Sequence, residues 1–116
     1  MTNITPIKVT IDSFQELVIK KSHKQLVILD ISAEWCGPCK ILESVLNSVI
    51  AEYNYDEFLL AKLEAEDENM KIAGQYSVRG FPTVIAFVRG KEVDRFHSAK
   101  EHDFVHDFID RNLEKF

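Results

Sequence analysis

The spacing of apolar residues along the chain changes repeatedly between the period of a strand and that of a helix. Residues 7–10 are expected to form an edge strand, and Ser13 and Glu16 then have the spacing of a helix capping box. The stretch QLVILDIS, residues 25–32, is almost continuously aliphatic, which is typical of a strand buried on both faces. This segment is therefore predicted to lie at the centre of a sheet.

A long amphipathic helix is predicted to follow, beginning at or near Cys36. Its apolar positions recur every three or four residues and are Ile41, Leu42, Val45, Leu46, Val49, Ile50 and Tyr53. The remaining elements, in order, are a strand at 58–63, a short helix at 68–76, a strand at 83–88, a turn at 89–91, an alternating edge strand at 92–97 and a closing helix that carries Phe104, Val105, Phe108, Ile109 and Leu113. The order β-α-β-α-β-α-β-β-α predicts an α/β fold, with a mixed central sheet flanked by helices on both faces.

The composition fits one globular domain spanning residues 1–116, because the chain is too short for two ordinary domains and no repeat or linker-like tract interrupts it. Lys plus Arg number 14 against 19 Asp plus Glu, and the net charge of −5 disfavours a nucleic-acid partner. No apolar run is long enough for a membrane span, and the N-terminus lacks the pattern of a secretory signal. A cytoplasmic protein that acts on proteins or small molecules is expected.

The two cysteines of the chain stand in WCGPC, residues 35–39, where a buried strand is followed by the long helix. A thiolate, not a thiol, attacks disulfides. Cys36 is placed to form one, because unpaired N–H groups and the positive end of the helix dipole stabilise negative charge at the start of a helix. Cys39, one turn into the helix, is expected to be the less exposed partner that resolves a mixed disulfide. Gly37 lets another backbone approach, and Pro38 suits the first turn.

Two other interpretations of the cysteine pair are less favoured. His102 and His106, four residues apart in the last helix, would complete a Cys2His2 zinc set, but the stretch between the two pairs is far longer than in compact zinc modules. A purely structural disulfide is disfavoured because so short a loop removes little entropy from the unfolded chain. Both histidines are instead expected to lie at a solvated edge of their helix.

Asp30 interrupts the aliphatic stretch VILDI and is a candidate proton acceptor. Burial of a carboxylate without a partner raises its pKa. Lys62 is a similar polar interruption in LLAKL, and it can pair with Asp30 and limit that rise if the two strands are neighbours. The alternative is that Asp30 simply faces water.

Taken together, DISAEWCGPCK, AKL, VRGFPT and the trailing RG turn resemble the thioredoxin family over essentially the whole chain. The resemblance implies the thioredoxin fold, with Cys36 as the attacking nucleophile and Cys39 as the resolving thiol. It implies that Trp35 caps the site. It also implies that Asp30 accepts a proton, through water, when Cys39 becomes the thiolate, and that Lys62 is the lysine near it.

The proline of GFPT, Pro82, precedes a strand, a position that permits a cis peptide bond but is by itself a weak signal. The resemblance makes cis the expected isomer. It also implies that this turn lies against the cysteines, helps to keep metals off them, and exposes the backbone of Phe81 to pair with a client strand. His97, with Ser98 in place of a common glycine, would make the client-binding surface bulkier and more polar. Ser44 replaces a proline that bends the long helix in many members.

The implied function is that of a general dithiol–disulfide oxidoreductase. It would reduce the disulfides of client proteins as a monomer, hold no cofactor or metal, and be re-reduced by a flavin-dependent thioredoxin reductase drawing on NADPH. Two alternatives stay open. A thiol oxidase or isomerase of the same fold would work outside the cytoplasm, although Gly37 and Pro38 between the cysteines favour reduction. A thioredoxin-like binding subunit, whose thiols matter little, is kept open by His97 and Ser98.

Overall fold

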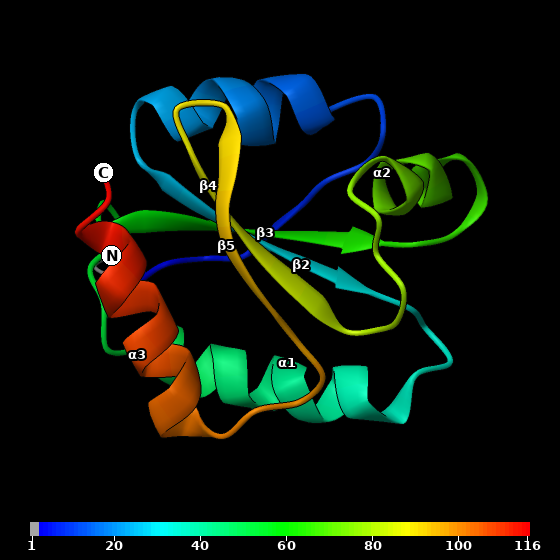
Figure 1. The fold of residues 1–116 in the computed structure, drawn as a ribbon. Helices are drawn as coiled ribbons and strands as arrows, with labels where there is room; N and C mark the ends of the chain where they lie inside the picture. Colours follow the sequence, from blue (N-terminus) through cyan, green and yellow to red (C-terminus); the bar gives the residue numbers. More distant parts are fainter. Residues whose placement is uncertain (1–2) are drawn as a thin grey trace.

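The computed structural model describes residues 3–116 and places five strands in one sheet, in the order β1-β3-β2-β4-β5 (Figure 1). The strands are β1 (Ile7–Lys8), β2 (Leu26–Ser32), β3 (Phe58–Glu64), β4 (Thr83–Val88) and β5 (Lys91–His97). β2 pairs in parallel with β3 and antiparallel with β4, so it has a neighbour on each side. The predicted central strand and the predicted mixed sheet are therefore both confirmed.

Helices cover both faces of this sheet. The segments are η1 (Gln15–Lys20), η2 (Lys21–His23), α1 (Gly37–Ile50), η3 (Asp67–Asn69), α2 (Met70–Gln75) and α3 (His102–Leu113). In Figure 1, α1 and α3 lie on one face, while the first helical segment and α2 lie on the other. No helix in the described part of the chain is long and apolar enough to cross a membrane.

Side chains of β2 divide between two apolar clusters, one on each face of the sheet. Leu26 and Ile28 belong to the cluster that contains Leu42 and Phe108 of α1 and α3. The alternate residues Val27, Leu29 and Ile31 belong to the opposite cluster, together with Phe14, Val18 and Ile72. Because side chains alternate along a strand, Asp30 is directed to the face covered by α1.

The structure of the N-terminal part of the chain differs from what its sequence pattern predicts. Strand β1 is only two residues long, although the N–H of Val9 still donates a hydrogen bond of 2.8 Å to the carbonyl of Lys62. The capping box predicted from Ser13 and Glu16 does not form. The Ser13 hydroxyl instead accepts a hydrogen bond of 2.9 Å from the N–H of Thr10, because the chain enters the helical segment through a tight turn that brings these groups together.

The long helix α1 begins at Gly37, close to the predicted start, and continues without interruption to Ile50, so Tyr53 of the predicted stripe lies beyond its end. Its apolar stripe is narrower than predicted, because Ile41 is 61% exposed. Leu42, Leu46 and Val49 occupy the face that contacts the sheet, and Ile41 lies about 100° around the helix from Leu42. Phe104 likewise lies at the exposed edge of α3, where its ring contacts that of Phe96 edge to face.

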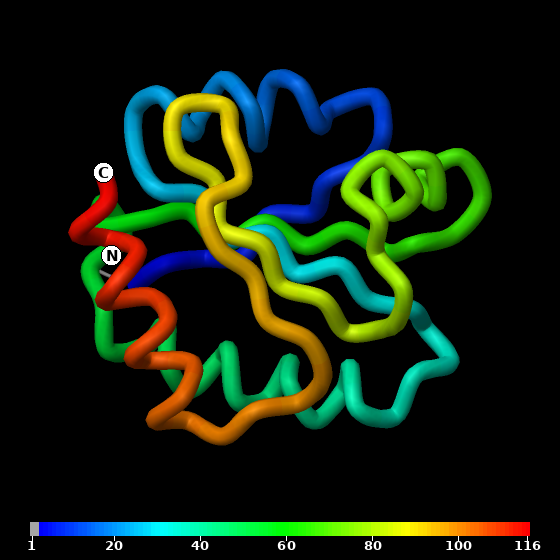
Figure 2. Tube along the Cα trace, viewed as in Figure 1, coloured from blue at the N-terminus to red at the C-terminus, as the bar shows by residue number. Residues whose placement is uncertain are grey.

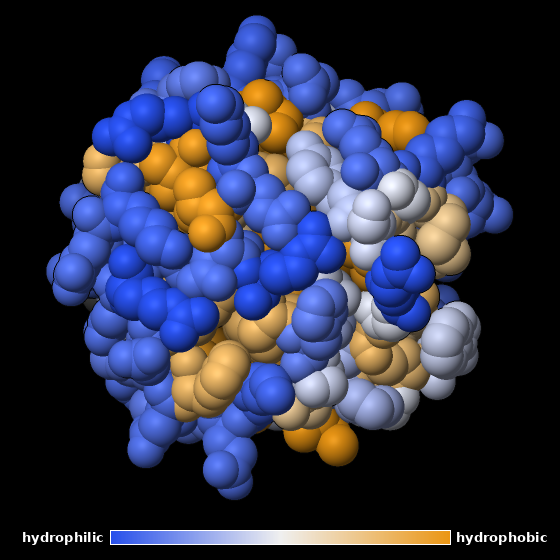
Figure 3. Space-filling model, in the orientation of Figure 1, coloured by the Kyte–Doolittle hydropathy of each residue, from blue (hydrophilic) through white to orange (hydrophobic). Residues whose placement is uncertain are grey.

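Two loops far apart in the sequence meet at one end of the sheet (Figure 2). One is the turn that joins β2 to α1, and the other is the loop that precedes β4. Figure 3 shows pale and light-orange residues at this end, the right-hand side of the view, while deeper orange patches lie elsewhere on a mainly hydrophilic surface. This end of the molecule carries the candidate site.

Candidate functional site

Cys36 is the N-cap residue of α1 and is joined to Cys39 by a disulfide, with 5.3 Å between their Cα atoms. Its extended backbone turns the side chain over the first turn of the helix, where the N–H of Cys39 donates to Cys36 Sγ at 3.2 Å. Gly37 is the first residue of the helix and Pro38 lies in its first turn. The N–H that proline lacks would have no partner within the helix at this position, so no hydrogen bond is lost. The helix start therefore offers a backbone donor and the positive end of its dipole to a sulfur anion.

The two cysteines are equally buried, at 4% and 5% exposure for Cys36 and Cys39. The expectation that Cys39 is the less exposed partner is therefore wrong for the disulfide form. Ala33 packs with both cysteines, and Phe81 packs against the same cluster from the opposite loop. Cys36 Sγ lies 3.6 Å from the carbonyl oxygen of Phe81, so the sulfur is covered by the facing loop as well as by its own helix.

The peptide bond between Phe81 and Pro82 is cis, as the resemblance implies. The ring of Phe81 meets that of Trp35 edge to face at 6.1 Å between centroids, and Trp35 is 80% exposed. Beside this pair lies a pocket of about 520 Å³, whose lining residues are Ser77, Arg79, Gly80, Phe81, Pro82, Arg95, His97 and Ser98. We call Trp35, Phe81 and this pocket the docking surface.

His97 and Ser98 both line the docking surface. The hydroxyl of Thr83 donates to the carbonyl of Gly80 at 2.8 Å, so its contact of 3.2 Å with Nδ1 of His97 requires the imidazole to be the donor. In the neutral ring, this tautomer leaves Nε2 of His97 as a hydrogen-bond acceptor. Ser98 has φ of +68°, the left-handed region that favours glycine, and its N–H donates to the carbonyl of Pro82 at 2.9 Å.

Asp30 lies in β2, directly opposite Lys62 of β3, and is 1% exposed. The alternative that it faces water is wrong. Desolvation by burial raises the pKa of Asp30 to about 6, the charge of Lys62 opposes the rise, and Glu43 adds to it. Its Oδ1 has no hydrogen-bond partner among residues 3–116. Such a carboxylate is suited to accept a proton near neutral pH.

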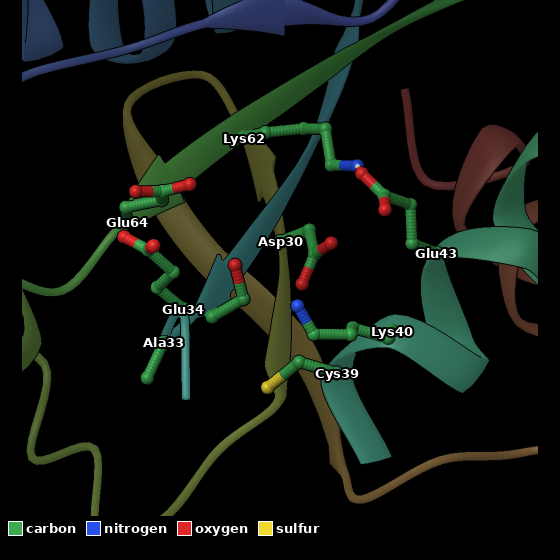
Figure 4. Close-up of a pocket in the computed structure, with 9 residues that line it drawn as sticks. Asp30, Ala33, Glu34, Cys39, Lys40, Glu43, Lys62 and Glu64 are labelled. Carbon is green, nitrogen blue, oxygen red and sulfur yellow. Dashed lines mark hydrogen bonds and ion pairs between the residues drawn. The ribbon is translucent and has the colours of Figure 1, made fainter. Parts of the chain in front are cut away.

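Lys62 does not pair directly with Asp30, contrary to one expectation from the sequence. Its amino group forms an ion pair with Glu43 of α1, which lies one turn beyond Cys39. Figure 4 shows the Asp30 carboxylate between the sulfur of Cys39 and the Lys62–Glu43 pair. These residues line one pocket of about 100 Å³, roughly enough space for water molecules between the carboxylate and the sulfur.

Sequence reasoning missed Glu43 and Lys40, which line the same pocket as Asp30. Glu43 could have been found from its position in the sequence, because it lies four residues after Cys39 and so falls on the same side of α1. Arg79, which lines the docking surface, was missed as well. Ser44 is exposed on α1, and the helix continues through it.

His102 and His106 do not combine with the cysteines. Both histidines lie on α3 and contact Glu52, whereas Cys36 and Cys39 are bonded to each other at the start of α1. The Cys2His2 zinc set is therefore wrong. Among residues 3–116, the one group of three His, Cys, Asp or Glu side chains whose ligand atoms all lie within 4.8 Å of one another is Glu34, Glu64 and Glu66, which contains neither Cys nor His.

Comparison with known proteins gives consistent matches. The family model described as Thioredoxin matches residues 5–111. The thioredoxin of Chlamydia caviae is 46% identical over 78 residues, which cover 67% of this chain and 74% of that protein. The thioredoxin of Griffithsia pacifica is 39% identical over 82 residues, or 71% of this chain and 72% of the relative.

A solved structure extends the likeness to three dimensions. The crystal structure of thioredoxin f from spinach chloroplast matches with a TM-score of 0.82 at 27% identity. The alignment covers 93% of this chain and 86% of the spinach chain. The similarity therefore extends over nearly the whole chain.

Proposed function

The chain belongs to the thioredoxin family and carries out dithiol–disulfide exchange, and we propose that Cys36 is its attacking thiolate and Cys39 its resolving thiol. The observation that supports these roles is the position of Cys36 Sγ at the helix start, where it accepts a hydrogen bond from the N–H of Cys39. A thiolate at Cys36 would keep this donor and the helix dipole, which favour the charged form. Cys39 Sγ has the inner position, next to the pocket of Asp30.

The reaction takes two exchange steps. The Cys36 thiolate attacks one sulfur of a client disulfide, so that a mixed disulfide forms and the client's other sulfur leaves as a thiolate. Cys39 then loses its proton and attacks Cys36 Sγ, which breaks the mixed disulfide and releases the client's second thiolate. The client gains two electrons, and the protein is left with the Cys36–Cys39 disulfide.

Asp30 would take the proton from Cys39 in the second step. The pocket of about 100 Å³ that joins the two residues would hold the water that relays it, and a pKa of about 6 makes the carboxylate a competent acceptor at neutral pH. Lys62 has a positioning role, because its charge offsets the desolvation of Asp30 while its amino group is held by Glu43.

Clients would bind at the docking surface. Trp35 offers exposed apolar area with the half-buried Phe81 beside it, and Gly37 and Pro38 leave the start of α1 open to an approaching backbone. The backbone of Phe81, next to the cis bond of Pro82, would pair with an extended client segment beside the disulfide. His97 and Ser98 would select among clients through polar contacts.

We further propose that residues 1–116 act as one monomeric domain that needs no bound cofactor or metal for this reaction. The working direction would be reduction of client proteins in the cytoplasm, with electrons supplied by a thioredoxin reductase that draws on NADPH. Gly37 and Pro38 between the cysteines favour this direction. A thiol oxidase or isomerase outside the cytoplasm and a binding subunit are the two alternatives.

A coupled assay tests these roles, with NADPH, a thioredoxin reductase and a protein disulfide as the final acceptor. Cys36→Ser should abolish NADPH oxidation. Cys39→Ser should accumulate a mixed disulfide with the client that is detectable by mass, while Ser44→Ala, exposed on the same helix, should behave as the unaltered protein. Full activity in the Cys36→Ser variant would remove the proposed role of Cys36.

A further inference from the structure

A second cluster of chemically active side chains lies near the C-terminal end of α1, at the opposite end of that helix from Cys36. It surrounds a pocket of about 300 Å³ whose lining residues are Glu52, His102, Asp103, His106, Asp107 and Asp110. Every one of these side chains is an imidazole or a carboxylate. Glu52 stands just beyond the last residue of α1, and the other five come from α3.

The two histidines both turn Nε2 toward the carboxylate of Glu52. His102 Nε2 is 2.5 Å from one oxygen, and His106 Nε2 is 3.3 Å from the other. Residues four apart on a helix lie on the same side of it, and the two rings are stacked with centroids 5.8 Å apart. Two imidazole nitrogens and one carboxylate thus converge from two elements that are distant in the sequence.

The opposite nitrogen of each ring is held by a further carboxylate. His102 Nδ1 lies 3.1 Å from Asp103, and His106 Nδ1 lies 3.0 Å from Asp110. Asp110 is itself fixed, because the hydroxyl of Tyr53 donates to its other oxygen at 2.6 Å. A histidine that binds a metal usually donates its second N–H to a carboxylate, which fixes the tautomer and directs the ligating nitrogen. The cluster has this outer arrangement around both rings.

We propose that His102, His106 and Glu52 bind a divalent transition-metal cation, with zinc as the reference ion. Both Nδ1–H groups would donate to Asp103 and Asp110, which leaves the lone pair of each Nε2 to bind the cation. Imidazole nitrogens favour zinc, copper and nickel over magnesium or calcium, and histidines at i and i+4 are a known zinc-binding spacing. Water would complete the coordination sphere.

Two properties of the cluster support this choice. The four surrounding carboxylates, of Glu52, Asp103, Asp107 and Asp110, outnumber the two imidazoles and favour a bound cation. The ligand atoms of His102, His106 and Glu52 do not all lie within 4.8 Å of one another, so binding requires these side chains to rotate, which the half-buried histidines and the exposed Glu52 permit. The bound ion would connect the end of α1 to α3, and it would stabilise the fold by an amount that grows with the logarithm of the zinc concentration once that concentration exceeds the dissociation constant.

Zinc titration by calorimetry tests the proposal, using the disulfide form of the whole chain purified without a polyhistidine tag. The disulfide removes both thiols as competing ligands, so the result is independent of the proposed redox function. We expect one saturable site. His102→Gln or His106→Gln should weaken binding at least 10-fold, and Asp110→Asn should weaken it about 10- to 100-fold through the outer shell.

His23→Gln is the matched control, because His23 is exposed and lies outside the cluster. It should bind zinc as the unaltered chain does. Each variant is checked for folding by circular dichroism and for dithiol–disulfide exchange in the coupled assay, which the cluster variants should leave unchanged. The proposal is overturned if the disulfide form shows no saturable zinc site, or if its affinity is the same in folded His102→Gln and His106→Gln proteins.

Discussion

Two carboxylates on the same sheet have opposite surroundings. Asp30, in the central strand, is fully buried, and one of its oxygens has no hydrogen-bond partner among the described residues. Asp94, in the edge strand β5, accepts hydrogen bonds from the side chains of Arg111 and Asn112 at 2.8 and 2.9 Å and from the N–H of Arg95 at 2.9 Å. The first carboxylate is isolated at the centre of the molecule, and the second is paired at its edge.

The pKa values of these two groups move in opposite directions. Desolvation dominates at Asp30 and raises its pKa to about 6. Desolvation also raises the pKa of Asp94, but the hydrogen bonds from Arg111 and Asn112 outweigh it, and the net shift is downward. The comparison teaches that partners, rather than burial alone, separate a carboxylate that stabilises the fold from one that is available for proton transfer.

The largest expected effect is on stability at Asp30. Its folded pKa of about 6 lies above the ordinary 3.8, so its charge lowers the free energy of unfolding as the pH rises from about 4 through 6. Two pKa units correspond to about 3 kcal/mol. Asp30→Asn should therefore stabilise the disulfide form by about that amount at pH 8 and by little at pH 4. Denaturant unfolding at both pH values measures this difference, and an equal change at both would contradict the account.

The next effect is on turnover. Asp30→Asn removes the proposed proton acceptor and leaves the docking surface intact, so the maximal rate of client reduction should fall on the order of 100-fold. The client concentration at half-maximal rate should change little. Steady-state kinetics in the coupled assay separate the two quantities. Equal losses in rate and in client binding would count against Asp30 as a proton acceptor.

Asp94→Asn provides the opposite case. It removes the charge that Arg111 and Asn112 contact, and we expect the free energy of unfolding at pH 7 to fall by about 1 to 2 kcal/mol with client reduction unchanged. Because the folded pKa of Asp94 is depressed, its stabilising contribution is present above pH 3.8 and is lost as the pH falls through the folded pKa. Urea unfolding at pH 7 and at pH 2 checks the sign, since the variant and parent should converge in acid.

The smallest expected effect concerns the charged pair beside Asp30. Lys62 lowers the pKa of Asp30 and Glu43 raises it, so Lys62→Met should move the acidic limb of the rate–pH profile upward and Glu43→Gln should move it downward. The opposite signs make each variant the control for the other. Shifts in the same direction would show that the pair acts through packing rather than through charge.

Much of the fold was predictable because periodicity reports burial. The aliphatic run of β2 and the three- and four-residue spacing in α1 identified the central strand and the site-bearing helix. The capping box predicted from Ser13 and Glu16 does not form, because a turn brings the Ser13 hydroxyl to the N–H of Thr10, an effect that the spacing of residue types does not contain. Exposure of Ile41 likewise depends on where the sheet lies relative to α1.

Most residues of the candidate site were predicted, but Glu43, Lys40 and Arg79 were not, and neither were the pairings. Cys36, Asp30 and Pro82 stand out in the sequence, and the structure brings the segments that carry them together. The ion pair of Lys62 with Glu43, in place of Asp30, depends on the rotation of α1 against β3. The equal burial of the cysteines depends on Phe81, which is 45 residues from Cys36 in the chain. Contacts of this kind follow from packing, which a single sequence does not specify.

The reduction potential of the Cys36–Cys39 pair tests the central claim most directly. It is measured by equilibrating the protein in glutathione buffers of known poise and quantifying the dithiol and disulfide forms. The account predicts a reduction potential of about −270 mV, which is typical of thioredoxins and suits a donor of electrons to client disulfides. A value near roughly −120 mV would contradict it, because the pair would then oxidise its clients and the proposed direction and compartment would both be wrong.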